Sequence, residues 1–182
     1  MFTMDMVVMW GQAFSFDFAK LLDNVEPTTT WIISKGKLGE SQLKIRIDDE
    51  LENTGKTLGD LEAGVGSIRI RIETMVINVH RNGKVKVSGK VPGEVKDDAT
   101  LQVWIQEVQS KVSAKLDIDL QNMRVVCLNG RSKVNTYVKI EQKEGRGRKV
   151  KKVGKCRLSQ NGKVEILGAK SVAEIVAELK KL

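Results

Sequence analysis

The sequence predicts an α+β protein made of two similar halves, each a small antiparallel sheet covered on one face by helices. The first observation is an internal repeat, because the stretch His80–Lys90 returns as Ser159–Ala169. Both copies read Asn-Gly-Lys-Val, then three residues, then Gly, and a helix-like run follows each of them. Two copies are too few for a solenoid, in which three or more repeats bury a continuous core. The repeat therefore indicates a pseudo-twofold molecule.

Each copy opens with the pattern of a β-hairpin. Asn82-Gly83 and Asn161-Gly162 are typical of a two-residue turn in which both central residues take a positive φ. The arms alternate, with Val79 on one face of the first strand and Asn78 and His80 on the other. We therefore expect a sheet with one buried face and one exposed face.

A helix follows each hairpin. Apolar residues recur at helical spacing in Ala99–Val112 and again in Val172–Leu182, and Ser171 is a suitable N-cap for the second run. These helices would cover the apolar face of the sheet and leave the polar face open.

Composition narrows the class of protein. The chain has 182 residues, a net charge of +8 and a pI near 9.5, and no apolar run long enough to span a membrane. Cys127 and Cys156 are too few for a disulfide framework or a zinc site, and His80 is the only histidine, so no histidine metal cluster can form. We expect an intracellular protein that binds no metal or cofactor and is not an enzyme.

The exposed face of the sheet is basic. Ser67–Glu73 alternates so that its two arginines lie opposite isoleucines, and the strands of the second half repeat this pattern. The segment Lys143–Arg157 holds eight basic residues and one acid, broken by glycines, and we interpret it as a loop that contacts phosphates. The ordinary alternative is that exposed strands carry Lys and Arg for solubility and to prevent edge pairing. The predicted nucleic-acid contacts on the face are Arg69, Arg71, Asn78, His80, Lys86, Tyr137, Lys139, Arg157 and Ser159, and those in the loop are Arg146, Arg148, Lys149 and Lys151.

Three segments carry a family resemblance. Lys163–Ser171, with its Leu-Gly-Ala-Lys, and Asp119–Val125, with its Gln-Asn-Met, resemble matching segments of the TATA-box-binding protein family. The N-terminal Met6–Trp10, followed by a helical Phe18–Leu22, is similar to that family's opening strand and short helices. The resemblance covers most of residues 1–27 and 67–182.

The resemblance implies a saddle, in which a curved antiparallel sheet carries helices on its convex face and binds the DNA minor groove on its concave face. The halves would be residues 1–116 and 117–182, with 28–66 as an insertion or a rearranged segment. Gln42–Ile47 within it alternates like a strand, so the first half could also begin there. The resemblance adds four groove contacts, which are Ser88, Asn122, Arg124 and Leu167.

The sequence also departs from that family. His80 and Ser159 stand where family members carry phenylalanines that wedge between base steps. Asp5 lies at a matching groove position, where it would repel phosphate. We therefore expect a weaker bend in the DNA and a relaxed preference for A·T pairs. The three tryptophans, Trp10, Trp31 and Trp104, are expected in cores rather than against bases.

The resulting prediction is a divergent, for example viral, protein that resembles the TATA-box-binding protein and acts on double-stranded DNA in transcription initiation. The resemblance implies a partner similar to general transcription factor IIB, a monomer or weak homodimer, and a nuclear location in a eukaryotic cell. The first alternative is a saddle that binds an acidic protein partner or another transcription factor. The second is a substrate-recognition domain of the kind attached to nucleases and glycosylases.

Overall fold

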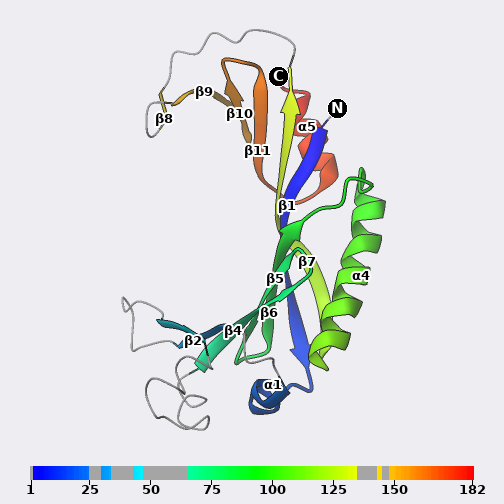
Figure 1. Ribbon diagram of the computed structural model, residues 1–182. Helices are drawn as coiled ribbons and strands as arrows, with labels where there is room; N and C mark the ends of the chain where they lie inside the picture. The colour runs from blue at the N-terminus through cyan, green and yellow to red at the C-terminus, as the bar shows by residue number, and fades with distance from the viewer. Residues whose placement is uncertain (1, 25–29, 34–42, 47–64, 135–142, 145–147) are drawn as a thin grey trace. The chain divides into compact units, whose positions relative to one another are not determined.

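The computed structural model describes residues 2–24, 30–33, 43–46, 65–134, 143–144 and 148–182 (Figure 1). Every pairing given below is antiparallel, and the described strands follow the order β3-β2-β4-β5-β6-β1-β7-β11-β10-β9-β8 in the sheet. The elements are β1 (Phe2–Phe14), α1 (Phe18–Asn24), β2 (Thr30–Ile33), β3 (Leu43–Arg46), β4 (Val65–Ile72), β5 (Met75–His80), β6 (Lys84–Lys90), α4 (Asp98–Leu116), β7 (Asp119–Lys133), β8 (Lys143–Glu144), β9 (Arg148–Val153), β10 (Cys156–Ser159), β11 (Lys163–Ala169) and α5 (Val172–Leu179).

The two helices expected from periodicity after the hairpins are confirmed, whereas the alternating stretch around Tyr137 and Lys139 lies outside the described residues. The predicted helix Ala99–Val112 is the central part of α4, and the predicted second helix begins at Val172 with Ser171 as its N-cap. The Ser171 hydroxyl oxygen accepts a hydrogen bond from the Glu174 backbone N–H at 3.0 Å. The alternating stretch Gln42–Ile47 contains β3.

The chain packs into two compact units that cut across the two sequence halves. Unit 1 comprises Met1–Met9, Ser88–Gln106 and Arg124–Leu182, and unit 2 comprises Trp10–Val87 and Glu107–Met123. The division at residue 116 therefore stays a prediction about the repeat, because each packing unit takes residues from both halves.

Unit 2 is built around the hairpin of β4 and β5. Ile68 lies directly opposite Val79, and Ile70 opposite Ile77, so these side chains share one face of the sheet. Ile68, Ile77 and Val79 are fully buried. In Figure 1 the C-terminal part of α4 runs beside β7, and its Val112 is fully buried. The apolar stripe of the helix thus meets the apolar face of the sheet.

Unit 1 repeats this arrangement with β9, β10, β11 and the C-terminal part of β7. Cys156 lies opposite Ile166 and Leu158 opposite Val164, and all four side chains are buried. Ile175 of α5 is fully buried as well. A bulge between Ile166 and Ala169 interrupts the pairing of β11 with β7.

Both predicted hairpins are present, but the predicted type of turn is wrong. Gly83 and Gly162 have φ of 82° and 78°, whereas neither Asn82 nor Asn161 has a positive φ. The backbone N–H of Gly83 donates to the His80 carbonyl oxygen at 2.9 Å, which makes a tight turn that ends on a left-handed glycine. Each asparagine instead accepts, through its side-chain oxygen, the backbone N–H two residues on.

The prediction of a glycine-rich basic loop over Lys143–Arg157 is also wrong for the part that the structure describes. Residues 148–153 form β9, and a short turn at Gly154-Lys155 leads directly into β10. Lys155 contacts the protein itself, because its Nζ lies 2.6 Å from Glu174 Oε1 and donates to the Gly168 carbonyl oxygen at 2.8 Å. Val150 and Val153 lie on opposite faces of this strand, and Lys151 and Lys152 between them stay exposed.

Candidate nucleic-acid interface

The face of unit 2 opposite its buried isoleucines and valines is basic. Arg69 lies opposite Asn78 and Arg71 opposite Val76, on the face that Ile68 and Ile70 do not share. On β6, Val85 and Val87 are fully buried and the lysines between and beside them alternate to the other side. The basic face of unit 2 consists of Arg69, Arg71, Lys84 and Lys86.

One arginine of this face is oriented by a neighbour. Arg69 Nε donates to Asn78 Oδ1 at 3.0 Å, and Asn78 is only 8% exposed. This bond holds the exposed guanidinium in place and satisfies a buried amide oxygen, which would be costly to leave unpaired. Both residues were predicted as DNA contacts, and the structure brings them together.

The prediction that Trp10 packs in a core is wrong. Its ring stacks on His80, with ring centroids 5.7 Å apart and planes inclined by 22°. Lys84 Nζ lies 4.9 Å and Lys86 Nζ 6.0 Å from the indole centroid. A Cβ on Gly11, the next residue of β1, would instead point at Met123 and Leu120. Trp10 is therefore half-buried on the basic face of unit 2.

Trp104 is half-buried on α4, and the side chain of Trp31 lies outside the described residues.

The surroundings of His80 favour its neutral form. Burial, followed by the positive charges of Lys84 and Lys86, lowers the pKa of His80 below its ordinary value.

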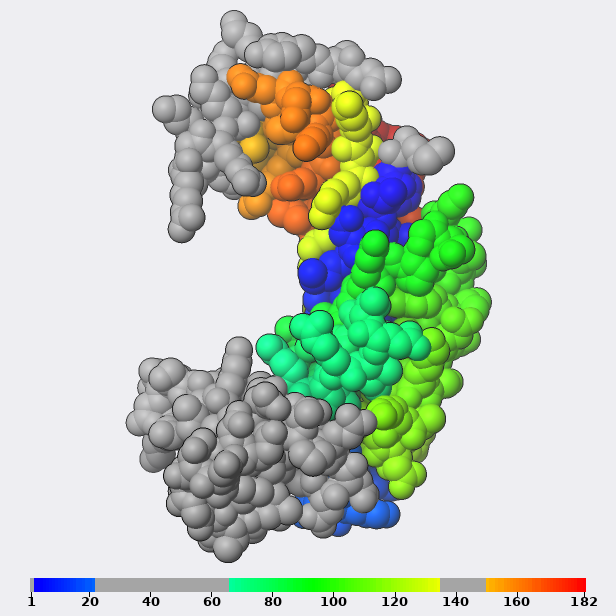
Figure 2. All heavy atoms as spheres, in the orientation of Figure 1, coloured from blue at the N-terminus to red at the C-terminus, as the bar shows by residue number. Residues whose placement is uncertain are grey.

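The basic face of unit 1 is a ladder of charges across four strands. Lys152, Arg157, Glu165 and Arg131 lie directly opposite one another on β9, β10, β11 and β7. The basic face of unit 1 consists of Arg131, Lys133, Lys152, Arg157 and Lys163. In Figure 2 the atoms of β10 and β11 (orange) and the end of β7 (yellow) form one continuous surface of this unit.

The expectation that Asp5 repels phosphate is wrong, because Asp5 forms an ion pair with Arg131. Arg131 Nε lies 2.5 Å from Asp5 Oδ2, so the carboxylate is paired with a cation that is itself 70% exposed. Asp5 therefore reduces the positive charge of unit 1 instead of forming an isolated negative site.

The register separates two neighbouring lysines of β9. Lys151 lies opposite Leu158, which is buried, whereas Lys152 lies opposite Arg157. Lys151 was predicted as a phosphate contact, and it occupies the other face of the strand from Lys152. The alternation of β9 relative to Arg157 would have indicated Lys152, and the alternation of β11 and β7 would have indicated Lys163 and Lys133.

The remaining predicted contacts are scattered. Asn122 is exposed and has a φ of 58°, which marks an irregularity in β7, and Arg124 beyond it is exposed. Ser88, Ser159 and Leu167 are half-buried. Arg148 and Lys149 belong to β9, and Tyr137, Lys139 and Arg146 lie outside the described residues.

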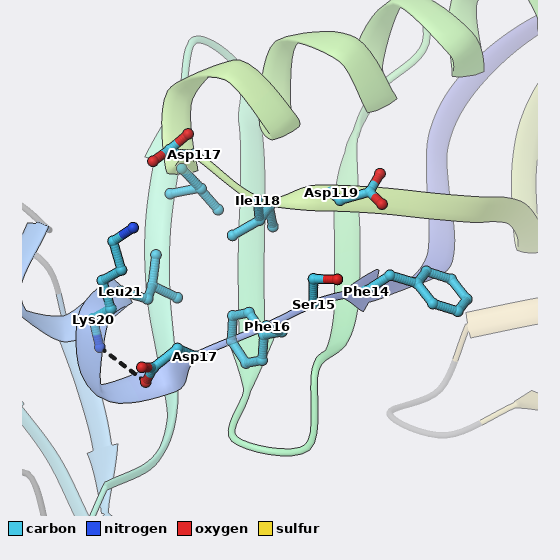
Figure 3. A pocket seen from close by; sticks show the side chains of 10 residues that line it. Phe14, Ser15, Phe16, Asp17, Lys20, Leu21, Asp117, Ile118 and Asp119 are labelled. Carbon is cyan, nitrogen blue, oxygen red and sulfur yellow. Dashed lines mark hydrogen bonds between the residues drawn. The ribbon is translucent and has the colours of Figure 1, made fainter.

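A pocket in unit 2 lies between the end of β1, α1 and the start of β7 (Figure 3). Phe16, Leu21 and Ile118 line it, and Asp17 Oδ1 accepts the Lys20 backbone N–H at 3.2 Å. Its volume of about 120 Å³ is well below the ~300 Å³ of the smallest typical ligand pockets.

The part of the chain that the structure describes holds no group of three His, Cys, Asp or Glu side chains that could bind a metal ion.

The arrangement of strands and helices is shared with a solved structure. The chain is similar to Methanococcus jannaschii TBP with a TM-score of 0.57 and 14% sequence identity, over 99% of this chain and 94% of that chain. The fold is therefore that of a TATA-box-binding protein, an open antiparallel sheet with a few helices, and the predicted α+β fold class is confirmed. No protein-family model matches the sequence, and no curated protein matches it.

Membrane insertion through a helix was not expected from the sequence. Among the described helices, none has both the length and the apolar character needed to cross a bilayer.

Proposed function

We propose that this chain binds double-stranded DNA in the minor groove through the basic faces of its two units, as a step of transcription initiation. The observation that supports this proposal most is that both units place their cations on the sheet face opposite the buried side chains. Lys and Arg arranged in this way neutralise phosphates and release counterions, which supplies most of the affinity for DNA. The fold shared with Methanococcus jannaschii TBP supports the same proposal.

The proposal extends to a general transcription factor IIB-like partner and to a location where DNA is transcribed, which is the nucleus in a eukaryotic cell. A saddle that binds an acidic protein is the competing function. Affinity for DNA in the absence of any partner separates the two, because a DNA-binding chain should bind a labelled duplex with an affinity that falls steeply between low and moderate salt.

Charge reversal on unit 2 tests the proposal. Arg71 and Lys86 are the suitable pair, because replacing Arg69 would also leave the amide of Asn78 unpaired. The double variant Arg71→Glu, Lys86→Glu should lose binding to a labelled duplex, measured by fluorescence anisotropy at moderate salt. The control is Lys20→Glu with Lys96→Glu, which changes the net charge equally at exposed positions outside both basic faces. Equal affinity of the two double variants would contradict the proposal.

Unit 1 offers a matched pair within one strand. Lys152→Ala should weaken binding to all duplexes and reduce the slope of log affinity against log salt by about 0.9, the value for one phosphate contact. Lys151→Ala removes the same charge from the opposite face of β9 and should leave the slope unchanged. A larger effect from Lys151 would mean that DNA contacts the other face of the sheet.

The choice of groove is tested with base analogues. An inosine·cytosine pair presents the minor-groove acceptors of A·T but a different major-groove pattern. Replacing A·T by inosine·cytosine in a bound duplex should therefore preserve affinity, and a large loss would indicate contacts in the major groove.

A further inference from the structure

Two hydrogen bonds, one in each repeat, show which residues of the preceding strands correspond to each other. The backbone N–H of Ala13, in β1, donates to the Gly83 carbonyl oxygen at 2.8 Å, and that of Val134, beside the end of β7, donates to the Gly162 carbonyl oxygen at 2.8 Å. Each bond joins the turn glycine of a hairpin to the strand that precedes it in its repeat. Ala13 and Val134 are therefore equivalent, and so are Trp10 and Arg131, three residues before them.

These equivalent positions have different surroundings. In unit 2 the Trp10 indole stacks on His80, and the ammonium groups of Lys84 and Lys86 lie near its ring. This arrangement is an aromatic surface with cations at its side, which is the combination that stacks on bases while holding phosphates.

Unit 1 has no such surface at the matching place. Arg131 is paired with Asp5 and lies opposite Glu165, and Ser159 occupies the position of His80. The Ser159 hydroxyl donates to the Lys163 carbonyl oxygen at 3.1 Å, within its own hairpin. These side chains can hold phosphates, but none of them offers a ring to a base.

We propose that Trp10, supported by His80, contacts an unstacked base step of the bound duplex, and that DNA is unstacked under unit 2 but not under unit 1. This inference rests on the proposed DNA binding and assigns a residue, on a strand other than the hairpin, to the distortion of DNA. Opening a base step costs a few kcal/mol, which an aromatic side chain offsets by stacking. The cost is lowest at pyrimidine–purine steps such as TA, so the protein should place unit 2 at such a step.

The experiment uses a mixed-sequence duplex with a single TA step whose adenine is replaced by 2-aminopurine, a base that fluoresces more strongly when it is unstacked. The full-length protein should raise this fluorescence, and Trp10→Phe should preserve most of the rise. Trp10→Ala should abolish the rise and weaken binding about tenfold, a typical loss for one stacking side chain.

Arg131→Ala is the matched control at the equivalent position. It should alter the affinity and its salt dependence but leave the 2-aminopurine signal of the complex at saturation unchanged. Circular dichroism melting should give Trp10→Ala a folded state like that of Trp10→Phe; if it does not, Trp10→Thr, which suits a strand and offers no apolar wedge, replaces it with the same expected loss of signal.

The outcomes separate the inference from the proposed function. Salt-dependent binding by the wild-type protein with a fluorescence rise that survives Trp10→Ala or Trp10→Thr, or with no rise at all, overturns the role of Trp10 and leaves DNA binding in place. A wild-type protein that shows no salt-dependent affinity for any duplex overturns both.

Discussion

At the scale of single residues, Gly154 combines a positive φ with close contact to a buried carboxylate. Its φ is 57°, and a Cβ there would lie 2.0 Å from Glu178 Oε2. Glu178 is only 7% exposed, and its carboxylate accepts the Lys155 backbone N–H at 2.8 Å and lies beside Lys181 Nζ. The turn between β9 and β10 is thus attached to α5 through one carboxylate that leaves no room for a methyl group.

Gly154→Ala should lower the free energy of unfolding by about 1–3 kcal/mol, because it combines a strained φ with the displacement of Glu178. Gly168→Ala separates the two causes, since Gly168 has a φ of 72° but a Cβ there would meet no surrounding side chain or backbone atom within 4 Å. Gly93→Ala has neither problem and should be nearly neutral. Urea unfolding of the three variants measures this order, and equal midpoints for Gly154→Ala and Gly93→Ala would contradict it.

Carboxylates of unit 1 make stability depend on pH. Hydrogen bonds from Lys181 and from the Lys155 backbone lower the pKa of Glu178, and those from Lys155 and the Lys170 backbone lower the pKa of Glu174. Their stabilising effect is fully present above the ordinary carboxyl pKa of about 4 and is lost as the pH falls through the lowered values.

The free energy of unfolding should therefore decrease below about pH 4. In Glu178→Gln this acid-induced decrease should be smaller, although the variant is less stable than the wild type at neutral pH. Chemical denaturation at a series of pH values checks both expectations, and identical pH profiles for the two proteins would show that Glu178 does not contribute.

At the scale of elements, α5 is held by a residue from another helix. Asp98, at the start of α4, accepts the backbone N–H groups of Val172 and Ala173 at 2.6 and 3.0 Å. Ser171 caps the next donor, so the first turn of α5 has its N–H groups satisfied by two separate side chains. The negative charge also lies at the positive end of the helix dipole.

Asp98→Ala should lower the free energy of unfolding by about 1–2 kcal/mol, the usual effect of losing an N-cap. Asp98→Asn should lose less, because an amide oxygen can still accept a hydrogen bond. Glu94→Ala, at an exposed site close by in the sequence, is the control and should change little. A thermal unfolding series decides the matter, and no difference between the alanine variants would show that the contact is not stabilising.

At the scale of the whole molecule, the proposed DNA binding leads to a prediction about how strongly the duplex is bent. His80 and Ser159 are predicted to stand where the TATA-box-binding protein family carries wedge phenylalanines, and among the described residues His80 stacks on an aromatic ring whereas Ser159 bonds within its own hairpin. A single stacking cluster can offset the cost of opening base steps at one place in the duplex, whereas two sets of wedges can do so at two places.

The bend should therefore be smaller than that produced by a phenylalanine-bearing family member in the same assay. Introducing His80→Phe and Ser159→Phe together should increase it. Energy transfer between dyes at the two ends of a bound duplex measures the angle. A wild-type bend equal to that of the phenylalanine-bearing protein would show that the wedge positions or their mechanism have been misassigned.

The sequence by itself determined the features that depend on a few neighbouring residues. The hairpins at Asn82-Gly83 and Asn161-Gly162, the helix that starts after Ser171 and the alternation of Arg69 and Arg71 all follow from turn, capping and strand preferences within one segment. Even there, the turn type was mispredicted, because a tight turn ending on a left-handed glycine suits the same dipeptide as the expected one.

Only the tertiary structure decided which distant residues meet. Trp10 is placed beside His80, and Arg131 beside Asp5, by the packing of strands far apart in the sequence. Lys155, one of the basic residues that suggested a phosphate-binding loop, forms an ion pair with Glu174 within unit 1. The sequence pattern around a basic residue or a tryptophan does not show whether its side chain contacts solvent, a core or an ion-pair partner. The register and packing of the strands distinguish these cases, since they determine the face on which each side chain lies and the charges beside it.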